Sequence, residues 1–200
     1  MGSQSVVDNN YIKKHIQNSV EIKQRVLADN SLLNELDVVA NLCVDAFKSG
    51  NKIILAGNGG SAADAQHIAA EFVSRFRFDR PGLPSLSLST DTSMLTAIGN
   101  DYGYDKLFAR QLQANGKSGD VFIGISTSGN SKNVLEAVHV AKELGVTSVG
   151  MTGGTGGLLR NSCDHLLLVP SDSTALIQEV HIMLGHIICG YVEDTLFSEA

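Results

Sequence analysis

Val121-Phe-Ile-Gly-Ile125, followed directly by Ser126-Thr-Ser-Gly-Asn-Ser131, predicts a buried strand that ends in a polar loop. Helical periodicity begins at Asn133 and runs to Leu144, so the loop also opens a helix. The N-terminus of a helix offers unpaired backbone N–H groups and a partial positive charge, which together favour anions. Three serines and a threonine add hydroxyl donors, and the loop contains no lysine or arginine. We therefore expect it to hold one phosphate monoester by hydrogen bonds.

The same arrangement occurs a second time in the chain. The apolar run Lys52-Ile-Ile-Leu-Ala56 is followed by Gly57-Asn-Gly-Gly-Ser61 and then by a helical pattern. A single loop of this kind could have a purely structural role, because Ser131 or Asn130 could cap the helix and Gly129 could form a tight turn. The occurrence of two such loops favours anion binding.

Neither loop matches a nucleotide-binding motif well. No Gly-Lys-Ser/Thr follows either loop, as the Walker pattern requires. Gly57, Gly59 and Ala62 approximate the dinucleotide G-x-G-x-x-G pattern, but no acidic residue stands clearly at the end of a second strand to bind a ribose.

Length and composition fit one globular domain. The 200 residues are 43% hydrophobic and 18% charged, and the net charge is −6. Because the chain has no basic run, we expect no nucleic-acid partner. It shows no signal pattern and no apolar stretch of membrane-spanning length, so we expect no membrane partner. Three scattered cysteines form neither a disulfide framework nor a zinc knuckle, which favours a cytoplasmic location.

Strands and helices are expected to alternate along most of the chain. Strands such as Ile53-Ile-Leu-Ala56 are apolar on both faces, which is typical of a buried parallel sheet. The order predicts one α/β domain over residues 1–200: a doubly wound parallel five-stranded sheet over 51–200, with an N-terminal helical extension over 1–50. The expected strands are 52–56, 85–89, 120–125, 147–151 and 165–169. The expected helices are 5–29, 32–49, 61–76, 91–98, 105–115, 132–144 and 174–196, with a short turn near 155–161.

The expected helix 61–76 carries two polar groups of catalytic type. His67 and Glu71 are four residues apart and share one face of this helix. Their spacing suits two ligands for a metal, or a base beside a group that tunes its pKa. A surface His–Glu pair is the alternative, but the helix is rich in alanine and so packs closely, which favours a shared pocket.

The expected helix 174–196 is largely apolar but contains Gln178, His181 and His186. His181 is as consistent with a core residue as with a functional one. Gln178 and His186 are eight residues apart, which is about 12 Å along a helix axis. Both can contact one ligand only if it lies between them, or if different subunits contribute them.

Taken together, these residues resemble the sugar isomerase (SIS) domain family, and within it the phosphoheptose isomerases, over nearly the whole chain. The motif Gly-Ile-Ser-Thr-Ser-Gly-Asn-Ser at 124–131 marks the broad family, and Ala-Gln-His-Ile-Ala-Ala-Glu-Phe at 65–72 and Ile-Gln-Glu-Val-His at 177–181, followed by His186, narrow it. Further similarity covers 57–76, 88–105 and 177–189. The resemblance implies a flavodoxin-like fold in a homotetramer, with N-terminal helices packed in the oligomer and active sites at subunit contacts.

The resemblance also implies an activity. The family members it points to are aldose–ketose isomerases that convert sedoheptulose 7-phosphate to D-glycero-D-manno-heptose 7-phosphate through an enediol. The product would be a precursor of heptose in the lipopolysaccharide core or another surface glycan. Glu71 and His186 match the acid/base pair, and we expect Glu71 to be the base.

Ligand positions carry over residue by residue. The resemblance implies zinc, one ion per subunit, whose matching ligands are His67, Glu71, Gln178 and His186. The residues that match substrate-binding positions are Asn58, Gly59, Ser61, Glu71, Arg75, Asp101, Ser126, Thr127, Ser128, Ser131 and Gln178. Many relatives have an arginine where this chain has Leu176, so any contact made by that arginine is in doubt here.

Two other functions remain open on the same fold. The end of the chain, Asp194-Thr-Leu-Phe197, is similar to the tail of a replication-initiation factor that binds the initiator protein without isomerase activity. That relative lacks the acid and the histidine found here as Glu71 and His186, which favours the enzyme. A sugar-phosphate-binding sensor, or an isomerase for another sugar, is the second alternative.

Overall fold

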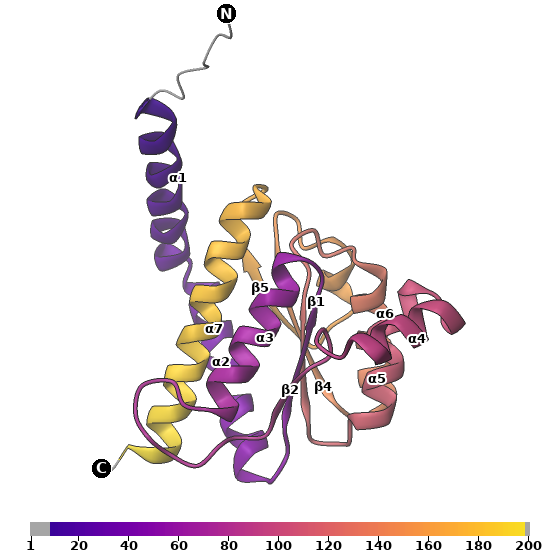
Figure 1. Cartoon of the computed structure of the whole chain (residues 1–200). Helices are drawn as coiled ribbons and strands as arrows, with labels where there is room; N and C mark the ends of the chain where they lie inside the picture. The colour runs from indigo at the N-terminus through magenta and orange to yellow at the C-terminus, as the bar shows by residue number, and fades with distance from the viewer. Residues whose placement is uncertain (1–8, 199–200) are drawn as a thin grey trace, which may run out of the picture.

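A computed structural model describes residues 9–198 and shows a five-stranded, all-parallel sheet covered by helices on both faces (Figure 1). The strands are β1 (Ile53–Gly57), β2 (Ser85–Ser87), β3 (Val121–Ile125), β4 (Thr147–Gly153) and β5 (His165–Val169). The helices are α1 (Asn9–Ala28), α2 (Asn30–Lys48), α3 (Gly60–Val73), α4 (Thr92–Tyr102), α5 (Leu107–Asn115), α6 (Lys132–Leu144) and α7 (Thr174–Phe197), with 3-10 turns η1 (Tyr104–Lys106) and η2 (Gly157–Asn161). The doubly wound sheet predicted from the sequence is confirmed.

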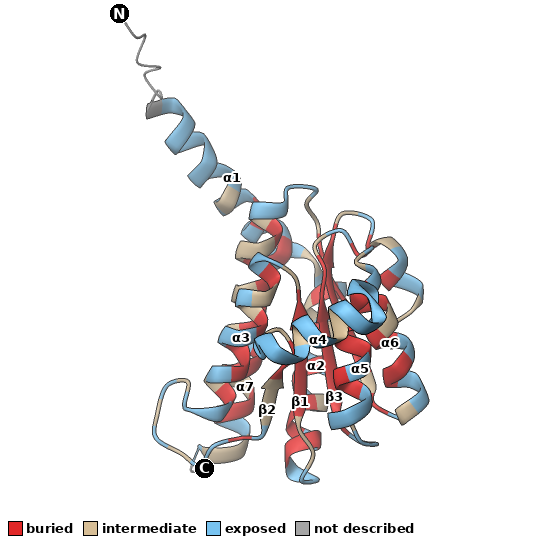
Figure 2. Cartoon of the chain, turned by 45° about the vertical axis from the view of Figure 1, so that its right-hand side comes forward, coloured by how far each residue is buried: buried red, intermediate tan, exposed pale blue. Residues whose placement is uncertain are grey.

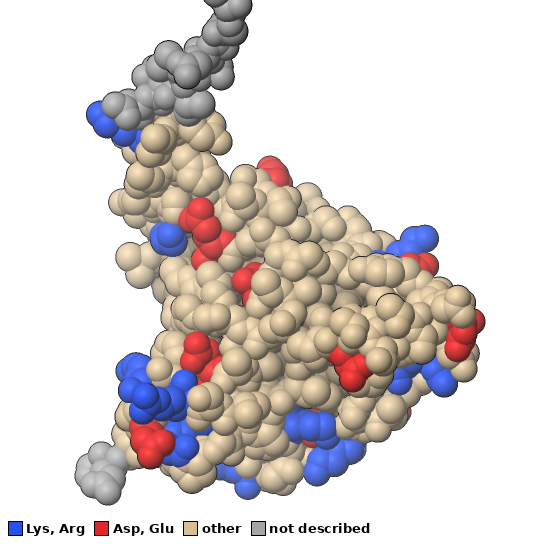
Figure 3. Space-filling view, viewed as in Figure 1, with Lys and Arg blue, Asp and Glu red and all other residues tan. Residues whose placement is uncertain are grey.

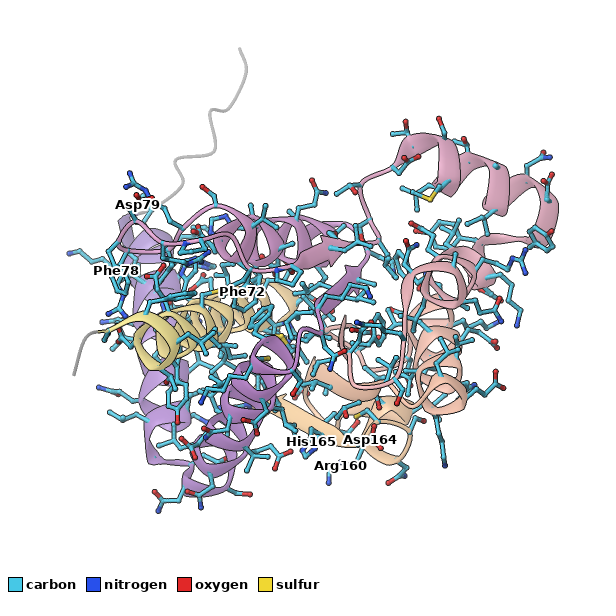
Figure 4. The ribbon with its side chains drawn as sticks, turned by 90° about the horizontal axis from the view of Figure 1, so that it is seen from below. Phe72, Phe78, Asp79, Arg160, Asp164 and His165 are labelled. Atoms are coloured by element: carbon cyan, nitrogen blue, oxygen red, sulfur yellow. The ribbon has the colours of Figure 1, made fainter. Side chains whose placement is uncertain are left out.

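The sheet separates two hydrophobic cores because successive side chains of a strand point to opposite faces. In β1, Ile53 and Leu55 pack with α2, α3 and α7, whereas Ile54 packs with α5 and α6. The central strands β1, β3 and β4 are buried, the edge strands β2 and β5 are partly buried, and the helices show an exposed outer side (Figure 2). At the β5 edge, His165 pairs with Glu35 of α2 at 2.9 Å between Nδ1 and Oε1, on the side where Figure 4 labels His165.

The strand order is β2-β1-β3-β4-β5, so the winding reverses between β1 and β3. The register pairs Gly57 at the end of β1 with Ile125 at the end of β3. The two polar loops therefore leave the sheet side by side at its carboxyl edge. Ligands of doubly wound sheets bind at this reversal.

Among the described residues, the helix ends lie within two residues of the expected ones, except at the C-terminal ends of α3 and α4. Residues 5–8 of the expected helix 5–29 lie outside the described part of the chain. α3 ends at Val73 and not at residue 76, because the side chain of Arg80 binds carbonyl groups at its end. α4 continues to Tyr102 and ends at Gly103, whose φ of +86° breaks the helix.

No apolar stretch of membrane-spanning length was expected from the sequence, and α7 shows that this expectation was wrong. By length and composition alone, α7 could cross a membrane. Half of its most apolar 18-residue window is buried, and the helix packs against α2 and α3. A core helix has this composition too, so the apolar character of α7 is explained by its place in the fold.

Candidate active site

The serine loop, residues 126–131, is closed by hydrogen bonds among its own groups. The hydroxyls of Ser126 and Ser131 lie 2.8 Å apart, and Ser126 is 3% exposed. Ser131 occupies the N-cap of α6 but its side chain makes no capping bond, so the capping alternative is wrong for this residue. Because the side chain of Ser131 does not cap α6, the N–H groups of Lys132 and Asn133 at its start are available to donate hydrogen bonds to an anion.

The loop is seated on the turn that follows β4. Gly129 has φ +69°, and a Cβ atom built on it would lie 1.9 Å from the carbonyl oxygen of Gly156. The N–H of Leu159 donates to the carbonyl of Gly129 at 3.0 Å. Only glycine fits this close contact, so the turn explanation for Gly129 holds alongside the anion-binding one. Thr127 and Ser128 line a cavity of about 190 Å³ with Thr155 and Asp172.

An amide pair joins the glycine loop, residues 57–61, to the first turn of α6, directly after the serine loop. Asn58 and Asn133 exchange hydrogen bonds in both directions, each at 2.9 Å, and Tyr104 donates from its hydroxyl to Asn58 Oδ1 at 2.9 Å. Asn133 is 2% exposed. Sequence reasoning missed Asn133 and Tyr104, because one stands at an ordinary first-turn position of α6 and the other lies in a polar segment. Gly59 and Ser61 follow Asn58 at the start of α3.

His67 and Glu71 of α3 converge with His186 of α7. Nε2 of His67 lies 3.2 Å from Oε1 of Glu71 and 2.9 Å from Nε2 of His186. One ligand atom from each of the three residues lies within 4.8 Å of the others. The ring of Phe76 lies beside that of His186, 5.5 Å away between centroids and tilted by 35°. His67 and Glu71 are therefore not an isolated pair, because His186 of α7 joins them.

The donor set of this triad fits zinc. Two imidazole nitrogens and one carboxylate oxygen are the protein ligands of many catalytic zinc sites, which keep a further position for water or substrate. Each donor is held on a helix, and two of the three come from one face of α3. The structure brings three of the four expected ligands together.

The fourth expected ligand, Gln178, lies elsewhere in the same chain. Its side chain covers Gly60, where an added Cβ would lie 2.4 Å from Gln178 Nε2. Gly60 begins α3, seven residues before His67, which places Gln178 about 10 Å from the triad along the helix. A metal at the triad is therefore not reached by Gln178 of the same chain in this arrangement.

Arg75 and Asp101 are also separate from both clusters. Arg75 is exposed beyond the end of α3 and, among the described residues, makes no hydrogen bond or ion pair. Asp101 is exposed in the last turn of α4 and accepts a hydrogen bond from its neighbour Asn100 at 2.8 Å. Within one chain, neither side chain contacts the serine loop or the triad.

The triad and the serine loop line different cavities. His186 borders a groove of about 700 Å³ along α7, together with Phe76, Met183 and Ile187. The cavity beside Thr127 and Ser128 lies at the carboxyl edge of the sheet, where α7 begins with Thr174 and Ile177. A single chain therefore separates the group expected to bind phosphate from the groups expected to move protons.

His181 is a buried residue of α7 and not part of the triad. It is 0% exposed, and its Nε2 lies 3.2 Å from the carbonyl oxygen of Thr152. Burial lowers the pKa of His181 to about 4, so the imidazole is neutral near neutral pH. Its Nδ1 has no partner among the described residues. The structure thus favours the core reading of His181.

Comparison with known proteins points to one family. The chain matches the family model described as the SIS domain over residues 14–153. It is 62% identical to a phosphoheptose isomerase of Aneurinibacillus thermoaerophilus over 94% of this chain and 96% of the relative. It is 56% identical to phosphoheptose isomerase 2 of Campylobacter jejuni, over 96% of this chain and 95% of the relative. A solved phosphoheptose isomerase structure from Neisseria gonorrhoeae superposes with a TM-score of 0.87 at 42% identity, covering 92% of this chain and 98% of that one.

Proposed function

The chain belongs to the SIS domain family, and we propose that it is an aldose–ketose isomerase that interconverts sedoheptulose 7-phosphate and D-glycero-D-manno-heptose 7-phosphate. The observation that carries the proposal is the convergence of Glu71 with His67 and His186 in a chain that also has the serine loop. A protein that only bound the sugar phosphate, or only bound a replication initiator, would have no need for this triad.

Isomerisation moves a proton between carbons 1 and 2 of the open-chain sugar, through an enediol. The proton is weakly acidic, so the reaction needs a base close to these carbons. Glu71 is the base: Oε1 faces His67, which leaves Oε2 free to take the proton and return it. His186 is the acid that exchanges a proton with the sugar oxygens. The Phe76 ring beside it limits the orientation of the imidazole.

Zinc belongs to the proposal as the ion held by His67, Glu71 and His186, one per subunit. When bound, it would polarise the substrate carbonyl. The two oxygens of Glu71 allow one carboxylate to serve as a ligand and as a base. Equilibrium dialysis of zinc against the wild type and His67→Ala tests the site without any activity measurement. Equal zinc content in both proteins would reject it.

The serine loop binds the phosphate at the end of the sugar opposite the reacting carbons. Ser126, Thr127, Ser128 and Ser131 supply hydroxyls, and the start of α6 supplies N–H groups. Binding energy from the phosphate positions the reacting carbons, which is how a remote group assists catalysis. Asn58, Gly59 and Ser61 border the sugar from the first loop. Replacing Ser126 and Ser128 by alanine should mainly weaken substrate binding, and unchanged binding would exclude the phosphate role.

A homotetramer with active sites at subunit contacts is the assembly we propose. Its support is the separation of the two clusters in one chain and the position of Gln178, Arg75 and Asp101 away from the triad. α1 extends from the body with Ile12, Ile16 and Val20 exposed on one side, where a neighbour can cover them (Figure 1). Such packing would bring the serine loop of one subunit to the triad of another.

Mixing two inactive variants tests the composite site. Glu71→Gln and the Ser126→Ala/Ser128→Ala variant are refolded together, so that mixed tetramers form. If each site combines both chains, some sites contain only intact residues and activity returns. No recovery beyond the sum of the separate variants would place a complete site in each chain. Light scattering on the wild type gives the oligomeric state independently.

The central test is Glu71→Gln on purified protein with sedoheptulose 7-phosphate. The amide keeps the shape but cannot take a proton, so turnover should fall about a hundredfold or more. Glu143→Gln, at an exposed position on α6, is the matched control and should retain full turnover. Near-normal turnover of Glu71→Gln would remove Glu71 from the base role.

We also propose a cytoplasmic location and a product that is used for a surface glycan. The free cysteines Cys43, Cys163 and Cys189 support the location.

A further inference from the structure

Glu193 is a buried carboxylate that the reaction described above does not use. It lies near the end of α7 and is 0% exposed. A carboxylate out of contact with water is stable only when several donors face it. Glu193 has three: the N–H of Phe76 at 2.9 Å, the N–H of Arg77 at 2.7 Å and Nε of Arg80 at 3.2 Å. Burial raises the pKa of this carboxyl, but these hydrogen bonds outweigh burial and leave the pKa below its usual value.

Arg80 connects this carboxylate to the end of α3. Its side chain is 2% exposed. Nη1 donates to the carbonyl of Phe72 at 2.5 Å, and Nη2 donates to the carbonyl of Glu71 at 2.8 Å. These carbonyls belong to the last turn of the helix, where they have no partner within the helix. Glu193 and Arg80 therefore bind α3 to α7 at one end.

The segment that Glu193 binds, Phe76–Arg77, lies beside the triad. Phe76, whose N–H donates to Glu193, places its ring 5.5 Å from that of His186. The segment loops out beside the C-terminal end of α7, at the end of the molecule where Figure 4 labels Phe78 and Asp79 (Figures 1 and 4). Basic and acidic side chains gather on the surface beside the C-terminal end of the chain (Figure 3). Arg77 of this segment forms an ion pair with Asp194 of α7.

We infer that Glu193 is a positioning residue for the isomerisation: it fixes the backbone of Glu71 through Arg80, and the ring of His186 through Phe76. The inference rests on the proposed function, since it needs Glu71 and His186 to act on substrate. It assigns a role in the reaction to a side chain that contacts neither the substrate nor a metal. Small displacements of catalytic groups are costly, so the loss of this network should lower turnover more than binding.

The test compares Glu193→Gln, Glu193→Asp and two controls. Glu193→Gln removes the charge and turns one acceptor into a donor that faces other donors. We expect kcat to fall about tenfold to a hundredfold while KM stays within about threefold, because the network of Glu193 and Arg80 includes no residue of the serine loop. Glu193→Asp keeps the charge and should recover part of kcat. Glu143→Gln controls for the chemistry of the change, and Leu112→Ala controls for lost stability in the opposite core.

Two outcomes would overturn the inference. One is a kcat for Glu193→Gln no lower than that of Leu112→Ala. The other is a rise in KM with unchanged kcat, which would indicate lost ground-state binding. If Glu193→Gln does not fold, Arg80→Lys replaces it, because lysine keeps a cation beside Glu193 but lacks the forked donors that bind α3. Unchanged kcat in Arg80→Lys would also overturn the inference.

A measurement without substrate separates this inference from the proposed function. If the wild type does not turn over sedoheptulose 7-phosphate, the proposed function fails, but hydrogen exchange still tests the network. The amides of Phe76 and Arg77 should be protected in the wild type and exchange about tenfold faster in Glu193→Gln. Equal exchange in both proteins would show that Glu193 does not hold the segment.

Discussion

Gly129→Ala should be the most damaging single methyl addition to the serine loop. Gly129 combines two constraints: a φ of +69°, which L-residues rarely adopt, and a backbone neighbour where the new methyl would sit. Gly50 offers a matched comparison, because its φ is +71° and nothing lies within 4 Å of an added Cβ. The two substitutions therefore share the backbone strain and differ in the contact.

The magnitude follows from the contacts. The left-handed conformation costs an alanine about 1–2 kcal/mol, which should be the whole effect at Gly50. At Gly129 the methyl would meet the Gly156 oxygen at 1.9 Å, so the loop or the turn after β4 must move. That movement weakens the bonds from Leu159 N–H to Gly129 O and from Gly129 N–H to Ser126 O, worth about 1 kcal/mol each. The expected loss of unfolding free energy is about 3–4 kcal/mol.

Urea unfolding of the wild type and both variants measures this difference, and kcat/KM measures its effect on the site. Displacing the loop by about 1 Å should lower kcat/KM by about a hundredfold. Gly50→Ala should leave kcat/KM unchanged, because Gly50 lies between α2 and β1, away from both clusters. If both variants lose the same stability, the loop does not rest on the turn after β4 and this reasoning is refuted.

Two further predictions follow from buried polar groups. The pKa of His181 is lowered to about 4 by burial, so the unfolded chain binds a proton more readily and stability should fall as pH drops from about 6.5 to 4; the loss is about 3 kcal/mol, and His181→Leu should remove that part of the pH dependence in urea titrations. An unaltered pH dependence of stability in His181→Leu would contradict this assignment to His181. Asn133→Ala breaks the amide pair with Asn58 and should cost about 1–3 kcal/mol, with a rise in KM larger than the fall in kcat; a fall in kcat alone would show that the pair does not serve binding.

The sheet could be predicted because local patterns carried the information. Apolar runs such as Val121–Ile125 are buried on both faces, and glycine- and serine-rich loops stand directly after β1 and β3. Parallel strands bring these loops to one edge whatever the details of packing. The convergence of His67, Glu71 and His186 was predictable in part. The i, i+4 spacing places His67 and Glu71 on one helix face, and the family resemblance added His186.

Other features depend on contacts between residues far apart in the sequence. The end of α3 is set by Arg80 and Glu193, and nothing near Val73 in the sequence signals it. Asn133 looks like any first-turn residue until Asn58, 75 positions away, is seen to pair with it. The place of Gln178 over Gly60 likewise depends on how α7 packs on α3.

Helix geometry explains why the proposed phosphate-binding loop and the proposed proton-transfer groups come from different elements. α3 begins at the carboxyl end of β1, and His67 stands about 10 Å further along its axis. The anion-binding N–H groups exist only at helix starts, whereas paired side chains such as His67 and Glu71 need a regular helix interior. In the proposed composite site, a substrate held by its phosphate at the serine loop of one subunit would present its reacting carbons to the triad of another. Affinity should then be altered at Ser126 and turnover at Glu71, because the two residues lie on different elements.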